Sequence, residues 1–173
     1  MQMLNRYFTP FALILISLAF YYRVPEEGET GLPMDIKLSI AIVAASVLVN
    51  WWLSANKYRF IRWATALRHG QVWINYLWSA LLVYFLVPYW APMWLLLVMA
   101  PVAAALSLGK GATWISGLVS AGTMLGIYAH RGMAPEGPAF GMALAHAAFI
   151  VIFSLFVHAL AEAALRLRDA GPA

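Results

Sequence analysis

Six apolar runs follow one another along the chain, separated only by short polar connections. They occupy approximately residues 7–22, 38–55, 72–87, 93–108, 113–128 and 140–165. Only helices and closed barrels satisfy their backbone hydrogen bonds inside hydrocarbon, and about 20 apolar residues are enough for a helix to span it. The runs therefore predict an all-α integral membrane protein, a six-transmembrane-helix bundle that forms one domain over residues 1–173.

The composition agrees with this class of protein. Of the 173 residues, 64% are hydrophobic and 10% are charged, whereas a soluble domain has roughly 25% charged residues. Lipid must therefore be part of the solvent. The net charge of +4 does not indicate nucleic-acid binding, because the basic residues flank apolar runs, where they meet anionic headgroups. The absence of cysteine excludes disulfides, thiolate metal sites and cysteine nucleophiles.

A basic stretch at residues 56–69 sets the expected topology. It holds Lys57, Arg59, Arg62 and Arg68, and basic residues between spans are kept on the cytoplasmic side. With the N-terminus inside, the inner segments hold eight basic residues and the outer loops three, which accounts for all eleven. We therefore expect both termini in the cytoplasm and a multi-pass protein of the bacterial-type inner membrane. The first span is expected to be retained, because Tyr21, Tyr22 and Arg23 replace a small-residue cleavage site.

The same stretch has a helical periodicity of its own. Phe60, Trp63, Ala64 and Leu67 recur at i, i+3, i+4 and i+7, and the basic residues fall largely off that stripe. This pattern predicts a short amphipathic helix lying in the membrane interface between spans 2 and 3. The alternative is a cytoplasmic extension of one of these two spans.

Polar residues inside spans are costly and are candidates for function. The list is short: Asn50, Asn75, His146, Ser154, His158 and Glu162. No aspartate lies within a span, which argues against an intramembrane aspartyl hydrolase and against a proton pump with a midplane carboxylate. No phosphate-binding glycine loop, HExxH or nucleophile motif is found either. We therefore expect no enzymatic activity.

Three residues of the last span share one helix face near its inner end. His158, Glu162 and Arg166 are spaced i, i+4 and i+8. They form either a local charge ladder that stabilises the helix as it leaves the bilayer, or an output face that contacts a protein partner or transmits a movement.

A ligand pocket is a further possibility. Asn50, Trp51, Asn75 and Trp78 are expected in the inner half of the bundle, and His146 is a further polar candidate within a span. The alternative is that the tryptophans belong to an interfacial belt and that His146 is a hydrogen-bonded packing residue.

The four histidines pair by expected depth. His130 and His146 should lie toward the outer face, and His69 and His158 toward the inner face. Two such layers would suit two haems in a helix bundle. The competing interpretation is that His69 and His130 are solvated helix caps. No cofactor or metal is predicted, with haem as the alternative.

Span 5 carries small residues at helical spacing. Gly117 and Ala121, and likewise Gly122 and Gly126, are four residues apart. Such spacing lets helix backbones approach closely. It predicts packing within the bundle, with self-association of two copies as the alternative.

From about Ser79 to Asp169 the chain resembles the six-span N-terminal sensor module of PilS-type histidine kinases. The run LLVYFLVPYWAPMWLLLVMAPVAAALSLGKGATWISGLVSAGTMLGIY is similar to their spans 3 to 5, and ALAEAALRLRD to the helix that leads into a cytoplasmic coiled coil. The chain holds no kinase domain, phospho-acceptor helix or ATP-binding lobe. The resemblance therefore implies a sensory or regulatory membrane subunit that acts through a protein partner or as a homo-oligomer.

In size, number of spans and inward termini the chain is also similar to the substrate-binding S components of energy-coupling-factor transporters. These carry an AxxxA coupling face in span 1, where this chain offers only Ala12 and Ala19. A small-solute transporter, or its substrate-binding subunit, is thus the second hypothesis. A bis-histidine haem or quinone carrier is the third.

Overall fold

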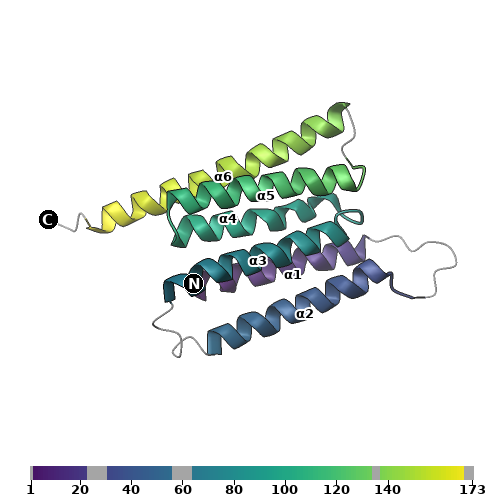
Figure 1. Cartoon of the computed structure of the whole chain (residues 1–173), viewed down its shortest axis with the longest axis horizontal. Helices are drawn as coiled ribbons and strands as arrows, with labels where there is room; N and C mark the ends of the chain where they lie inside the picture. The colour runs from purple at the N-terminus through teal and green to yellow at the C-terminus, as the bar shows by residue number, and fades with distance from the viewer. Residues whose placement is uncertain (1, 23–30, 56–63, 134–136, 170–173) are drawn as a thin grey trace. The chain divides into compact units, whose positions relative to one another are not determined.

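The computed structural model describes the backbone of residues 2–22, 31–55, 64–133 and 137–169. Within these ranges the regular structure is entirely helical, as predicted. The elements in chain order are α1 (Gln2–Tyr21), α2 (Met34–Ala55), α3 (Ala64–Leu86), the 3₁₀ helix η2 (Ala91–Leu95), α4 (Leu96–Ser107), α5 (Lys110–His130) and α6 (Gly137–Asp169) (Figure 1).

Three helices in the described part of the chain are long and apolar enough to cross a membrane. Their apolar segments are Met34–Leu53, Lys110–His130 and Gly137–Arg168. Two further apolar helical stretches, Pro10–Tyr21 and Ala91–Ser107, are shorter. The α3 helix has 23 residues but is more polar in its first half. These helices indicate a membrane protein, as expected from the sequence.

The start of α3 differs from the separate interfacial helix that was expected. The part of that segment that the structure describes, residues 64–69, is continuous with the rest of α3. A single glycine, Gly70, separates it from the apolar part, and one glycine costs a helix only about 1 kcal/mol. The described part thus follows the alternative, an extension of span 3. Residues 56–63, with Lys57, Arg59 and Arg62, lie outside the described residues.

The fourth apolar segment, expected as helix from residue 93, begins as a 3₁₀ helix. Trp90 is extended, Pro92 lies in the first turn of η2, and regular α-helix begins only at Leu96. Proline is favoured at the start of a helix because its missing N–H would have no partner there. The Met93 side chain is nevertheless buried.

The chain divides into two compact units, residues 1–96 and 97–173. In the first unit, α2 packs along α3, and η2 contacts both α1 and α3. Ile36 on α2 and Val83 and Leu86 on α3 are fully buried. At the end of α1, the ring of Tyr22 stacks on that of Trp90, with centroids 6.4 Å apart.

The second unit is organised by the long contact between α5 and α6. Met124 on α5 and Ala143 and Ile150 on α6 are fully buried there. Before α5, Gly109 adopts a φ of 96°, which turns the chain sharply after α4 and is open to glycine at little cost.

After α5, a Schellman turn ends the helix. Gly132 has a φ of 65°, the Met133 N–H donates to the Tyr128 carbonyl, and the Gly132 N–H donates to the Ala129 carbonyl.

Helix α6 is much longer than its neighbour. It has 33 residues, against 21 in α5. Its C-terminal turns extend past the turn between α4 and α5 (Figure 1). The side chains from Glu162 to Arg168 are all exposed, so the end of α6 is the part of the second unit most open to its surroundings.

Candidate functional site

The first part of the site joins α6 to the end of α4. The Nδ1 atom of His158, on α6, lies 3.1 Å from the Ala105 carbonyl oxygen. Because α4 ends at Ser107, Ala105 is among the last four residues, whose carbonyls have no partner within the helix. An imidazole that carries its proton on Nδ1 satisfies this carbonyl, and a positive charge there also favours a helix C-terminus.

The second part lies one and two turns further along α6. Arg166 Nη2 is 2.6 Å from Glu162 Oε1, and the two side chains are 77% and 50% exposed. The positive charge of Lys110 also acts on the Glu162 carboxylate. An exposed pair at i, i+4 contributes only about 0.3–0.5 kcal/mol to stability.

The three residues of the expected output face therefore differ in their surroundings. His158 is half-buried and bonded to α4, while Glu162 and Arg166 are displayed to the surroundings. The sequence analysis did not name Ala105 or Lys110. The end of the apolar run before Gly109 could have indicated both residues. The helix that ends there leaves carbonyls such as that of Ala105 without a partner, and the next helix begins at Lys110.

A second polar cluster joins α2 to α3. Asn50 Nδ2 donates to Asn75 Oδ1 at 3.3 Å, and Gln71 Nε2 donates to Asn50 Oδ1 at 3.5 Å. Asn50 and Asn75, predicted to share a pocket, are thus in contact. Gln71 was not named in the sequence analysis, although it precedes Asn75 by four residues and so shares its helix face.

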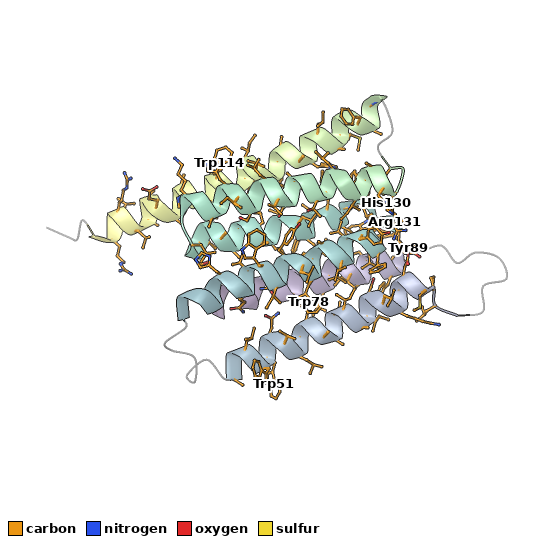
Figure 2. All side chains as sticks on the ribbon, viewed as in Figure 1. Trp51, Trp78, Tyr89, Trp114, His130 and Arg131 are labelled. Carbon is orange, nitrogen blue, oxygen red and sulfur yellow. The ribbon has the colours of Figure 1, made fainter. Side chains whose placement is uncertain are left out.

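The two tryptophans expected in that pocket differ in their surroundings. Trp51 is 68% exposed and points away from α3 (Figure 2). Trp78 is half-buried, and its Nε1 atom is buried without a hydrogen-bond partner among the described residues. The fifth candidate, His146, is half-buried on α6, in the second unit.

The remaining histidines lie at helix ends. His69 is exposed near the start of α3, and His130 is exposed in the last turn of α5. Among the described residues, no group of three or more His, Asp or Glu side chains is arranged to hold a metal ion. Of the basic residues expected at the membrane interface, Arg68 lies in the first turns of α3.

The small residues of α5 fall on two different faces. Gly117 and Ala121 are buried, and a Cβ added at Gly117 would meet the Val151 Cα of α6 at 3.7 Å. Gly122 and Gly126 are exposed, with open space around them. The first pair therefore lies at the contact with α6, and the second pair lies outside it.

No family model, curated protein or solved structure matches the chain. What the molecule does must therefore be inferred from its own residues.

Proposed function

We propose that this protein is a non-enzymatic sensory or regulatory membrane subunit that signals or docks through its last helix. In this proposal six helices span a bacterial-type inner membrane with both termini in the cytoplasm. The distribution of basic residues supports that orientation, since eight of the eleven then lie on the inner side.

The observation that carries the proposal is the length of α6 together with its exposed C-terminal end. A helix of 33 residues is about 50 Å long, whereas the hydrocarbon core is about 30 Å thick. The exposed end of α6 displays Glu162 and Arg166, and His158 links the same helix to the end of α4. A displacement of α4 or of the turn at Gly109 would therefore be passed to the displayed end of α6. The resemblance to PilS-type sensor modules supports the same assignment.

The test is a pull-down of the tagged protein from native membranes in mild detergent, followed by mass spectrometry. The expected result is a co-purifying kinase, cyclase or larger membrane assembly. The E162A and R166A variants should lose this partner. A matched control is Q71L, which alters a polar contact in the first unit and should retain it. Purification of the wild-type protein without any partner would overturn the proposal.

A second candidate function is supported by the amide cluster of α2 and α3. Three amide side chains in contact, Gln71, Asn50 and Asn75, are unusual in apolar helices and would suit the binding of a small polar solute. Solute uptake that depends on a partner ATPase and is lost in N75L would favour a transporter or its substrate-binding subunit. Normal uptake of all tested solutes in a deletion strain would argue against it.

A further inference from the structure

A buried hydrogen-bond donor on α3 lacks an acceptor in the described part of the chain. The Nε1 atom of Trp78 is buried and has no hydrogen-bond partner there. An indole nitrogen can only donate, and the N–H of a buried tryptophan usually has an acceptor. This position therefore calls for an acceptor oxygen.

A second donor belongs to the amide cluster. Gln71 donates to Asn50 Oδ1, and Asn50 donates to Asn75 Oδ1. The two bonds run in the same direction, and neither of them uses the amide N–H groups of Asn75. Hydrogen bonds in a series polarise one another, so the series ends on a strengthened donor at Asn75.

The two donors lie one turn apart on one face of α3. At 100° per residue, Gln71, Asn75 and Trp78 fall within an arc of about 60°, and side chains three residues apart are neighbours on a helix surface. The bonds to Asn50 show that this face is turned toward α2. The Asn75 amide and the Trp78 indole, labelled in Figure 2, are thus placed to donate to the same group.

The stretches that carry the two donors and face them are uncharged. Residues 38–56, with most of α2, and residues 70–109, with most of α3, hold no Asp, Glu, Lys, Arg or His. A charged group would lose its hydration there without gaining a counter-charge. Asn75 and Trp78 are only half-buried, and Leu48 and Trp51 of α2 are 62% and 68% exposed. In a membrane this helix pair is open to the bilayer, so a suitable ligand is uncharged and soluble in lipid.

We propose that Asn75 and Trp78 bind an uncharged, membrane-soluble molecule through a carbonyl oxygen. A carbonyl oxygen has two lone pairs and no proton, so it can accept from both donors at once. Quinones and fatty-acid esters carry such an oxygen. The inference rests on the second candidate function, whose small polar solute it narrows to this class of ligand.

The test measures binding to the protein purified in dodecyl maltoside, a detergent without a carbonyl group. The probes are decylubiquinone and dioctanoylglycerol, which distinguish a quinone from an ester, and decylbenzene is the control ligand without an acceptor oxygen. Isothermal titration calorimetry gives each Kd. At least one of the two probes should bind, and decylbenzene should not. The infrared carbonyl band of the bound probe should lie at lower wavenumber than in empty micelles.

Two variants locate the site. W78F keeps an aromatic ring but lacks the N–H, so it should weaken binding of the probe roughly three- to ten-fold, as expected for one hydrogen bond, and reverse part of the infrared shift. W73F is the matched control, because Trp73 is 40% exposed and lies about 140° around α3 from Trp78. Its Kd should stay within about two-fold of wild type. Equal thermal unfolding of the two variants without probe confirms that both are folded.

Three results would overturn the proposal. Binding of neither probe would mean that water satisfies the two donors. Equal affinity for decylbenzene would mean that only apolar contact holds the probe. Equal losses in W73F and W78F would mean that the indole N–H of Trp78 is not the donor.

Failure of this inference differs from failure of the proposed functions. Probe binding together with unchanged uptake in N75L would refute the transporter and leave the binding site in place. Uptake that is lost in N75L, without binding of either probe, would refute the carbonyl ligand alone. Capture of a partner through α6 is independent of both, because Asn75 and Trp78 lie on α3.

Discussion

The imidazole of His158 reaches across from α6 to the Ala105 carbonyl, 53 residues earlier in the chain, at 3.1 Å from Nδ1. This bond supplies a partner to a carbonyl at the end of α4, and it holds α6 at one place along α4.

Replacing His158 by leucine should destabilise the protein by about 0.5–1.5 kcal/mol, because the Ala105 carbonyl loses its side-chain partner. Unfolding in a mixed-detergent titration measures the change. The control is H69L, since His69 is exposed and its replacement should stay within about 0.5 kcal/mol of wild type. An H158L variant as stable as H69L would show that the bond contributes nothing.

The amide chain between α2 and α3 allows a graded test. Asn50 takes part in both hydrogen bonds, whereas Gln71 takes part in one. Hydrogen bonds between membrane helices average about 0.6 kcal/mol each, so N50L should cost about twice as much as Q71L in the same unfolding titration. Equal losses in the two variants would contradict the arrangement.

Bulky substitutions should separate the two glycine faces of α5. G117L places a side chain against the α6 backbone near Val151 and should cost about 1–3 kcal/mol by overpacking. G122L enters open space and should have little effect on stability. Thermal unfolding in detergent compares the two variants, and a G122L variant that unfolds as readily as G117L would refute the assignment.

Exchange of the charges of Glu162 and Arg166 distinguishes stability from docking. In the double variant E162R/R166E the ion pair can form again with reversed polarity, so stability should change by no more than about 0.5 kcal/mol. Capture of the partner in the pull-down should nevertheless be lost, because the displayed charges are inverted. Retained capture would mean that these two residues serve only the helix itself.

Much of the helical layout could be predicted from the sequence. Apolar runs and the glycines and prolines between them mark the helices, and the i, i+4 spacing correctly places Glu162 beside Arg166. The start of α3 could not be predicted in the same way. A 3.6-residue stripe before Gly70 is equally compatible with an interfacial helix and with an extension of the next span.

Tertiary contacts set the other limits of the prediction. The partner of His158 is a backbone carbonyl, and its availability depends on where α4 ends and how α6 lies against it. Spacing alone also does not determine which face of α5 is turned toward α6. It predicts small-residue packing equally for Gly117 and Gly122, although only Gly117 approaches another helix.

The amide chain of Gln71, Asn50 and Asn75 also limits how the first unit can move. Gln71 and Asn75 lie one turn apart on α3 and bond the same side chain of α2 from both sides. A sliding motion of α2 by even one residue, about 1.5 Å, would lengthen one bond as it shortened the other. The two hydrogen bonds thus fix the position of α2 along α3. The two helices can tilt together as a rigid pair, whereas sliding of one helix along the other must break at least one of the two bonds.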